Sequence, residues 1–232
     1  MDDSRTVALI GEEAVSKLKN AVVAVFGVGG VGSYAAESLA RSGVGTIRLG
    51  DDDVVKSSNI NRQLVALEST IGTHKTRVMH NRIKDINPEI KVITYELFYD
   101  ALTSEEIFAN KIDYVVDAID SIKSKVMLIC ECKNRNIKIV SSMGAGNKLY
   151  PEKFEVMDIY ATNYDPIAKI LRKQLRAYGI EDLKVVCSVE QPRKSNCADD
   201  QKCIPASIAF VPSVCGLILS GIVIRELAGI DE

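Results

Sequence analysis

The chain has 232 residues, a formal net charge of −2 and 47% hydrophobic residues. This length can bury the core of one large α/β domain, or of one domain with an appendage. The balanced charge argues against a globally basic nucleic-acid binder, although it leaves room for a local basic patch. The N-terminus is acidic and lacks the apolar core of a signal peptide, so we expect a cytoplasmic protein whose six cysteines stay reduced.

The first two-thirds of the sequence alternates between strand and helix patterns. The expected strands lie at residues 22–26, 46–51, 91–97, 113–120 and 137–142. One helix is expected at 30–42, where Gly43 ends it, and a second one begins at a Thr73 cap and runs to residue 86. Thr103 and Glu106 form a capping-box pattern for a short helix, and a longer helix is expected at 121–134. This order predicts a parallel sheet with right-handed crossovers and a ligand site beyond the carboxyl ends of its strands.

The pattern changes after Gly146. Strands of a mixed or antiparallel extension are expected at 154–160, 183–190 and 207–211, with a basic helix at 166–180. The predicted fold class is therefore α/β, with a Rossmann-like, mostly parallel sheet, helices on both faces, an extension of antiparallel strands and a C-terminal core helix. We interpret residues 1–146 as a Rossmann-like core and residues 147–232 as a C-terminal extension of the same domain.

An apolar tract at residues 204–224 requires a separate interpretation. It is apolar for about twenty positions, which approaches the length of a membrane span. Pro212 interrupts the tract, and Pro212 with Ser213 predicts the start of a shorter helix that ends near Gly229. We favour a buried core helix over a membrane span, so no membrane partner is expected.

A glycine-rich segment follows the first expected strand. Gly27, Gly29 and Gly32 fit the pattern G-x-G-x-x-G, with Gly30 between them, and the segment opens a helix. In this context one glycine permits a tight turn, one lets a phosphate approach the backbone, and one lets the helix pack closely on the strand. The helix N-terminus adds N–H donors, so the segment predicts a phosphate cradle.

The residues that follow the cradle favour a nucleoside triphosphate over a nicotinamide dinucleotide. Asp51 ends the second strand, where an acid accepts ribose hydroxyls, but ribose occurs in both NAD and ATP. A dehydrogenase needs a second body for hydride transfer, and the roughly 85 residues after the sheet contain no histidine. Arg62 and Lys75 fall in a segment that leaves the same sheet edge, where Asp120 could hold Mg²⁺. Two cations and one acid beside a glycine cradle indicate a triphosphate site.

Four motifs together indicate a family. GVGGVGS, DDDVVKSSNINRQ, IGTHK and DAIDSIKSK, in this order, resemble the ubiquitin-activating-enzyme-like family of adenylating enzymes (ThiF, MoeB, HesA). The resemblance implies ATP-dependent adenylation of a substrate carboxylate with release of pyrophosphate. It implies that Asp51 binds ribose, that Asp120 ligates Mg²⁺, and that the phosphates are surrounded by Asn59, Arg62, Gln63 and Lys75. Arg5 matches an arginine that family members lend to the ATP of the neighbouring subunit, which implies a homodimer.

The cysteines argue against zinc and against a thioester. The sulfur-carrier activators of this family hold zinc through two Cys-x-x-Cys pairs, and this sequence has none. Cys130 and Cys132 have the wrong spacing inside a helix, and Cys197 and Cys203 are separated by five residues. The thioester cysteine of the ubiquitin-activating branch has no clear counterpart. Cys187 alternates with apolar residues in an expected strand, so we interpret it as a buried structural thiol.

The second half resembles one subgroup, the tRNA threonylcarbamoyladenosine dehydratases. The matching segments are SSMGAGNKLYPEKFEVMDIYATNYDPIAKILRKQLRAYGI, LKVVCSVEQPR and FVPSVCGLILSG. The resemblance implies that the threonyl carboxylate of the modified adenosine attacks the α-phosphate of ATP. The acyl-adenylate is then captured by the carbamoyl group of the same modification, which closes a ring and expels AMP. The implied partner is tRNA carrying threonylcarbamoyladenosine, and a sulfur-transfer or redox protein remains open as a further partner.

A tRNA substrate calls for a basic surface. Four cations of the basic helix follow i, i+3, i+4, i+7 spacing, namely Lys169, Arg172, Lys173 and Arg176. The opposite face is expected to carry Ile170, Leu171 and Leu175. An ordinary solvated helix face explains the same pattern equally well. The following loop adds charges of both signs, from Arg193, Lys194, Lys202, Asp199 and Asp200.

Two other functions stay open at this point. One is an adenylyltransferase that activates the C-terminal glycine of a ubiquitin-like sulfur carrier, against which the basic helix and the missing zinc pairs argue. The other is a nicotinamide-binding regulator or dehydrogenase, which comparative binding of ATP–Mg²⁺ and NAD(H) would separate from the first two.

Overall fold

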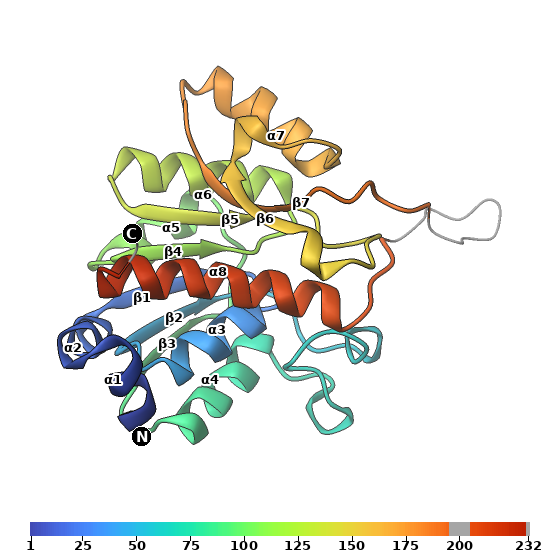
Figure 1. The fold of residues 1–232 in the computed structure, drawn as a ribbon. Coiled ribbons are helices and arrows are strands. Elements are labelled where there is room, and N and C mark those ends of the chain that lie inside the picture. The colour runs from blue at the N-terminus through green and yellow to red at the C-terminus, as the bar shows by residue number, and fades with distance from the viewer. Residues whose placement is uncertain (195–204, 231–232) are drawn as a thin grey trace.

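The computed structural model describes residues 1–194 and 205–230 and contains a seven-stranded sheet in the order β3-β2-β1-β4-β5-β7-β6 (Figure 1). The strands are β1 (Val22–Phe26), β2 (Thr46–Gly50), β3 (Lys91–Tyr95), β4 (Tyr114–Asp117), β5 (Lys138–Ser142), β6 (Phe154–Asp158) and β7 (Lys184–Ser188). All neighbours pair in parallel except β6, which runs antiparallel to β7 at the edge. The predicted fold class is confirmed, with one antiparallel strand where the sequence predicted several.

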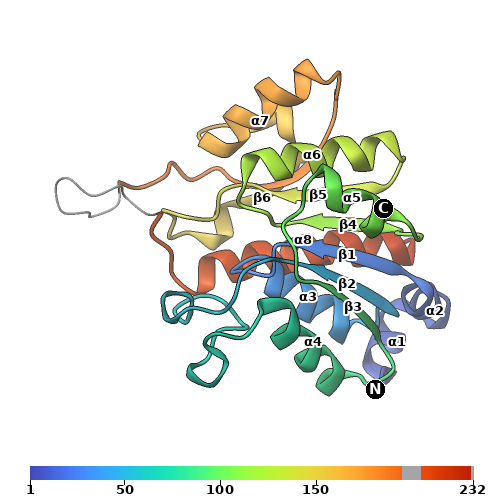
Figure 2. The ribbon, with the colours of Figure 1, turned by 180° about the vertical axis from the view of Figure 1, so that it is seen from behind.

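Helices cover both faces of the sheet. One layer holds α1 (Ser4–Ile10), α2 (Glu12–Asn20), α3 (Gly32–Arg41), α4 (Lys75–Ile86) and α8 (Phe210–Ala228), and α8 crosses the front of the sheet in Figure 1. The view from behind shows the other layer, which holds α5 (Ala101–Phe108), α6 (Ile122–Asn134) and α7 (Pro166–Ala177) (Figure 2).

The central strand β1 shows why both faces are covered. Val23 and Val25 belong to the apolar core under the front layer, whereas Ala24 and Phe26 belong to the core under the back layer. Side chains of a strand alternate between the two faces, so a strand that is apolar at every position must be buried on both. The chain extends from β1 to β2 and β3 on one side, and from β4 to β5 on the other. This reversal opens a crevice at the carboxyl ends of β1 and β4.

Three local predictions are wrong. Residues 207–211 form no strand, because Phe210 and Val211 already belong to the first turn of α8. The capping box of α5 consists of Asp100 and Thr103, three residues before the pair that the sequence suggested. Strand β4 ends at Asp117, so Asp120 lies in the loop that follows the strand.

Helix α8 is longer than expected, and it packs on α3 and the sheet. Pro212 occupies its first turn, where a missing N–H leaves no helical hydrogen bond unmade, and Gly229 ends the helix with a φ of 72°. A Cβ at Gly216 would lie 2.2 Å from the carbonyl oxygen of Val31, so glycine permits the close contact between α8 and α3. By length and composition α8 could cross a membrane, and less than half of it is buried. It packs on α3, α2 and β5 as part of the front layer of helices.

Candidate adenylation site

The glycine cradle has the geometry that its motif predicts. Gly27 has a φ of +83°, and a Cβ there would lie 2.4 Å from the carbonyl oxygen of Ala118 in the loop after β4. A Cβ at Gly32 would lie 1.8 Å from the carbonyl oxygen of Gly27, so Gly32 serves the packing of α3 against the turn. Gly29 and Gly30 line the adjacent cavity, and a Cβ at either position would meet no atom closer than 3.3 Å. The turn is therefore tight at its base and open toward the cavity.

A cavity of about 420 Å³ lies beyond the carboxyl ends of the central strands. It brings together most of the predicted site residues, namely Gly27, Gly29, Gly30, Asp51, Arg62, Gln63, Lys75 and Asp120. Three predicted residues, Gly32, Asn59 and Arg5, are not part of its wall. This volume falls in the range of small-molecule sites.

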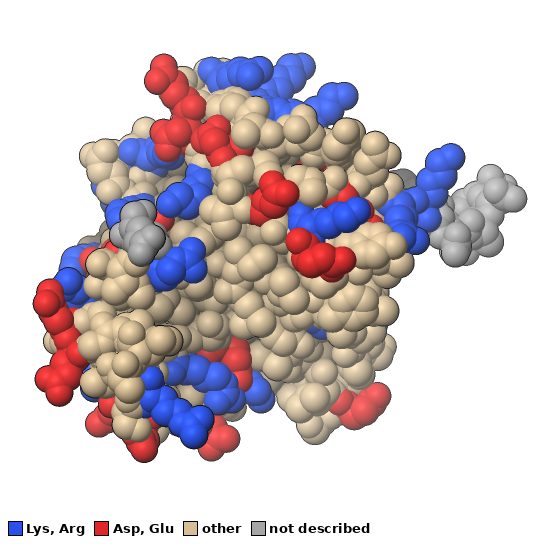
Figure 3. Space-filling model, in the orientation of Figure 1, with Lys and Arg blue, Asp and Glu red and all other residues tan. Residues whose placement is uncertain are grey.

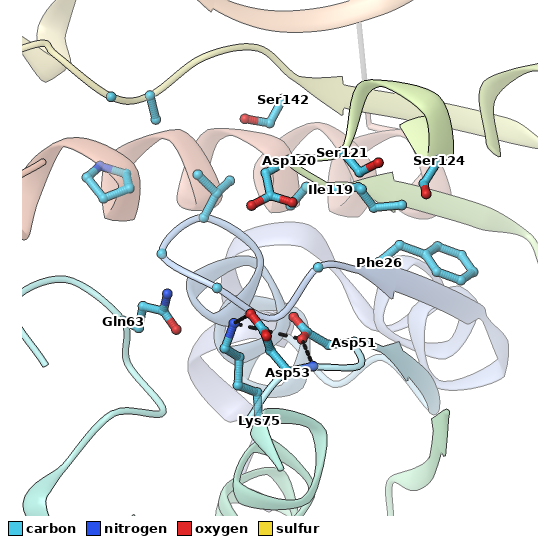
Figure 4. Close-up of a pocket in the computed structure, with 18 of the residues that line it drawn as sticks. Phe26, Asp51, Asp53, Gln63, Lys75, Ile119, Asp120, Ser121, Ser124 and Ser142 are labelled. Atoms are coloured by element: carbon cyan, nitrogen blue, oxygen red, sulfur yellow. Dashed lines mark hydrogen bonds and ion pairs between the residues drawn. The ribbon is translucent and has the colours of Figure 1, made fainter. Parts of the chain in front are cut away.

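Asp51 lies at the centre of a hydrogen-bonded group at the end of β2 (Figure 4). Its Oδ2 accepts a hydrogen bond from the Val28 N–H at 2.6 Å, and its Oδ1 accepts one from the Asp53 N–H at 2.9 Å. Burial raises the pKa of the Asp51 carboxyl, against the opposing effects of Lys75 and of the two N–H donors. Asp51 thereby ties the glycine cradle to the end of β2.

Lys75, the first residue of α4, is held by the same group. Its Nζ lies 2.7 Å from Asp53 Oδ2 and 3.8 Å from Asp51 Oδ1, and the residue is only 5% exposed. The hydrogen bond from Lys75 lowers the pKa of the Asp53 carboxyl. The Lys75 ammonium is therefore neutralised by the Asp53 and Asp51 carboxylates.

The loop between β2 and α4 presents Arg62 and Gln63. The Asn59 carboxamide accepts a hydrogen bond from the Lys56 N–H, and the Asn59 carbonyl accepts from the N–H groups of Arg62 and Gln63. Asn59 therefore shapes the loop that carries these two side chains. The Arg62 guanidinium donates to the carbonyl of Ser58 and to the Asn61 carboxamide. The part of the Arg62 side chain that lies beside Gly30 is its Cγ, and the residue lines the cavity.

Asp120 is exposed and lines the cavity from the loop between β4 and α6. Within residues 1–194 and 205–230 it has no hydrogen-bond or ion-pair partner, and no group of three or more His, Cys, Asp or Glu residues could hold a metal ion. One free carboxylate is nevertheless compatible with Mg²⁺, which binds through one or two carboxylates together with phosphate oxygens and water.

A buried ion pair beneath the cavity was not predicted. Lys125 Nζ lies 2.8 Å from Asp117 Oδ2, and both side chains are at most 1% exposed. The ammonium also donates to the Ser141 hydroxyl and to the carbonyl of Ser142, so the pair joins α6 to β4 and β5. Removing one partner of such a pair costs about 3–5 kcal/mol. The motif DAIDSIKSK contains both residues, but nothing in it indicates that Lys125 points inward.

A second buried pair fixes the far wall of the cavity. Asp165 Oδ2 accepts hydrogen bonds from Lys148 Nζ at 3.0 Å and from the Gly144 N–H at 3.1 Å. Asp165 Oδ1 caps α7 by accepting from the Ala168 N–H, and Lys148 also donates to the carbonyl of Gly144. The loop of residues 144–146 on the cavity wall is thus fastened to the start of the basic helix.

The cations of α7 have different environments. Lys169 and Lys173 are exposed, and Figure 3 shows Lys and Arg side chains gathered over α7. Arg172 is half-buried and donates to the Thr162 carbonyl and hydroxyl, while Arg176 stacks on the ring of Tyr160 at 4.9 Å.

The opposite face of α7 and the loop after β7 complete this region. Leu171 and Leu175 are buried as predicted, but Ile170 is 45% exposed, so its placement on the buried face was wrong. Arg193 stacks on the ring of Tyr150, and Lys194 is exposed. The other predicted loop charges, Asp199, Asp200 and Lys202, lie outside the described residues.

Arg5 lies far from the cavity of its own chain. It is an exposed residue of α1, and α1 lies at the opposite end of the molecule from the loop that joins β2 to α4 (Figure 1). Any contact between Arg5 and ATP therefore requires a second copy of the chain.

The described cysteines have the character of structural thiols. Burial raises the pKa of Cys187 to about 12 and that of Cys215 to about 11, and it raises the pKa values of Cys130 and Cys132 as well. Cys187 is 1% exposed in β7, as the strand pattern predicted. Cys197 and Cys203 lie outside the described residues.

Comparison with known proteins identifies the family of this chain. A sequence model of the ThiF family matches residues 2–232. The chain belongs to the ThiF family. A tRNA threonylcarbamoyladenosine dehydratase of Bacillus subtilis is 49% identical, with 97% of this chain and 93% of the relative covered. One of Escherichia coli is 41% identical, with 75% of this chain and 66% of the relative covered.

A solved structure agrees with this placement over nearly the whole chain. The crystal structure of Escherichia coli tRNA N6-threonylcarbamoyladenosine dehydratase in complex with ATP superposes with a TM-score of 0.90 at 32% identity. The match covers 97% of this chain and 93% of that one. The similarity therefore includes both the strand–helix core and the segment after residue 146, which the sequence likened to this subgroup.

Proposed function

We propose that this protein catalyses the ATP-dependent dehydration, by cyclisation, of N6-threonylcarbamoyladenosine in tRNA through an acyl-adenylate. The observation that carries the proposal is the match along almost the full length to relatives of that name, one of which has a structure in complex with ATP. The cavity also supports the proposal, because the glycine cradle, the proposed ribose acceptor Asp51 and the cations Arg62 and Lys75 all line it.

Two displacements make up the reaction. A carboxylate oxygen of the threonyl group bonds to the α-phosphorus of ATP, and the bond to pyrophosphate breaks. The carbamoyl group then bonds to the acyl carbon and gives up a proton to solvent, and the bond to AMP breaks. The protein contributes charge stabilisation and positioning, and it needs no nucleophile of its own. The raised pKa values of the four described cysteines agree with such a route.

The predicted site residues then have the following roles. The N–H groups of the cradle and the side chains of Arg62 and Lys75 stabilise charge on the phosphates, and Asp51 accepts from the ribose hydroxyls. Gln63 contributes its carboxamide to the same wall, and Asn59 holds the loop. Asp120 would hold Mg²⁺, which when bound neutralises phosphate charge.

We also propose a homodimer that buries the face of α8. Phe210 and Leu217 on α8 are 46% and 48% exposed, and Val156 on the adjacent sheet edge is 46% exposed. Figure 3 shows a largely uncharged surface over α8. Helix α1, with Arg5, lies on the same side of the sheet (Figure 1). A two-fold axis across this face would bring the Arg5 of one chain to the cavity of the other.

The tRNA is proposed to bind along α7, through Lys169 and Lys173 with Arg172 and Arg176 beside them. The segment 147–232 serves as a C-terminal extension of the ATP-binding core 1–146, because α8 packs on α3 of that core. The fold and the reduced thiols suit a cytoplasmic enzyme. We assign no described surface to a sulfur-transfer or redox partner.

The test is the reaction itself. Purified protein with ATP and Mg²⁺ is incubated with tRNA that carries threonylcarbamoyladenosine, and the nucleosides are analysed by mass spectrometry together with AMP and pyrophosphate release. We expect loss of one water from the modified nucleoside for each AMP formed. Unmodified tRNA is the matched control. Pyrophosphate release that responds to the Gly-Gly tail of a sulfur-carrier protein, and not to the modified tRNA, would overturn the proposal.

A further inference from the structure

One wall of the cavity contains a hydroxyl group without a partner. Ser124 lies in the first turn of α6, is 1% exposed and lines the cavity. Its Oγ is buried and has no hydrogen-bond partner among the described residues. Buried hydroxyls are nearly always hydrogen-bonded, so a ligand group is the natural partner of one that faces a cavity.

The surroundings of Ser124 suit a flat aromatic ligand. Phe26, Leu97 and Ile119 line the same cavity, and the ring of Tyr99 lies edge-on to that of Phe26 at 5.3 Å. In Figure 4, Phe26 and Ser124 lie on one side of Asp51, and Gln63 lies on the other side. An apolar slot with few polar groups is typical of a site for a planar ring.

The order of these groups along the cavity matches the order of the parts of a nucleotide. Gln63 lies beside Gly29, and the Arg62 Cγ lies beside Gly30. In Figure 4, Gln63 lies at one end, the proposed ribose acceptor Asp51 lies in the middle, and Ser124 lies at the other end. A triphosphate that places its ribose on Asp51 and its phosphates on the cradle must place its base in this slot.

We propose that Ser124 determines the specificity for adenine by accepting a hydrogen bond from its 6-amino group. This inference rests on the proposed function, because it assumes that ATP occupies the cavity. The Ser124 hydroxyl oxygen can accept a hydrogen bond, and the 6-amino group of adenine is a donor, so the two groups are complementary.

The test compares two triphosphates in the full-length protein. ATP carries the 6-amino group, whereas purine riboside triphosphate lacks it and is otherwise the same. We expect the wild type to bind ATP about tenfold more tightly, and Ser124→Ala to lose this preference by weakening the binding of ATP alone. Isothermal titration calorimetry measures the affinity of the wild type and of Ser124→Ala for each of the two triphosphates.

Thermal unfolding without nucleotide separates this role from a structural one. Because Ser124 Oγ has no partner among the described residues, Ser124→Ala is expected to keep the midpoint of the wild type or to raise it. Ser142→Ala is the matched control, because Ser142 also lines the cavity but its hydroxyl donates to the carbonyl of Met143. That variant is expected to lower the midpoint and to leave the preference for ATP intact.

Two results would overturn the inference without touching the proposed function. One is a Ser124→Ala variant that retains the full preference for ATP. The other is a Ser124→Ala variant whose affinity for both triphosphates falls by the same factor. If the wild type binds neither triphosphate, the assumption that ATP occupies the cavity fails, and the proposed function fails with it.

Discussion

Lys75 Nζ lies 2.7 Å from Asp53 Oδ2, so the ammonium at the start of α4 is already paired before any nucleotide binds. Lys56 Nζ lies 3.5 Å from Asp53 Oδ1, but its side chain is 60% exposed and does not line the cavity. The two lysines therefore share a carboxylate, but only Lys75 lines the cavity.

This pair gives the first prediction. Lys75→Met, which keeps the length of the side chain, is expected to slow pyrophosphate release about 100-fold, because it removes a cation that stabilises charge on the phosphates. Lys56→Met is expected to slow it by less than about twofold, since an exposed ion pair contributes little. Equal effects of the two substitutions on the rate would contradict the assignment of Lys75.

Asp51 and Asp53 are predicted to respond to pH in opposite directions. Burial raises the pKa of Asp51, so ionisation of this carboxyl costs stability as the pH rises from about 3.8, its ordinary value, through the raised pKa. Lys75 lowers the pKa of Asp53, so the stability that ionised Asp53 contributes is present above its ordinary pKa and is lost as the pH falls through the lowered one.

Substitution of each aspartate by Asn should reveal these opposite dependences of stability on pH. At pH 7, Asp51→Asn is expected to leave the thermal midpoint unchanged or raised while it weakens ATP binding about tenfold. Asp53→Asn is expected to lower the midpoint at pH 7 and to have less effect near pH 3. The measurement is the midpoint of thermal unfolding of the wild type and of each variant, without nucleotide, from pH 3 to pH 8. An Asp51→Asn variant that is least stable, relative to wild type, at the highest pH would refute the role of burial.

Asp120 is predicted to act through Mg²⁺. Because it is exposed and has no partner among the described residues, Asp120→Ala should unfold at the wild-type temperature. Its pyrophosphate release should fall about 100-fold at a fixed concentration of Mg²⁺ and recover in part as Mg²⁺ is raised. Asp85→Ala, which removes an exposed acid of α4, is the control. A rate for Asp120→Ala that equals the rate for Asp85→Ala would exclude the metal role.

Arg5 is predicted to act on the neighbouring chain. Arg5→Ala and Asp120→Ala should each be nearly inactive alone. When the two are unfolded, mixed in equal amounts and refolded, half of the dimers contain one chain of each kind, and one of the two sites in such a dimer is complete. Activity should therefore return to about a quarter of the wild-type value. A mixture that stays inactive, although wild-type protein refolds under the same conditions, would argue against a shared site.

The lysines of α7 are predicted to contact the RNA backbone. Lys173→Glu should weaken tRNA binding more at low salt than at high salt, and it should reduce the slope of log affinity against log salt by about 1. Lys91→Glu reverses one exposed charge at the start of β3 and serves as the control. The exposed lysines provide a cleaner test than Arg172, whose contact with Thr162 also stabilises the fold. Equal salt slopes for the two variants would remove α7 from the tRNA site.

The sequence predicted the features that depend on chain order and backbone geometry. Parallel strands share a carboxyl edge, so the glycines after β1, Asp51 after β2 and Asp120 after β4 had to converge. Gly27 and Gly32 were also predictable from their motif, because a Cβ at either position would clash with a backbone carbonyl oxygen.

The features that the sequence did not predict depend on three-dimensional partners. Lys125 is buried because Asp117 and Ser141 lie opposite it on neighbouring strands, and no local pattern contains that information. Arg172 fits the periodicity of an exposed stripe, yet Thr162 binds it. Residues 207–211 have a strand-like composition, but α8, which packs on α3, already begins at Phe210.

The double attachment of Asp165 has a consequence for the spacing between α7 and the cavity. One carboxyl oxygen caps α7 and the other accepts a hydrogen bond from Gly144, so one side chain joins the start of the helix to the cavity wall. A shift of α7 along its own axis would therefore break a buried hydrogen bond at the cavity wall, and the distance between the basic helix and the cavity is set by this single carboxylate.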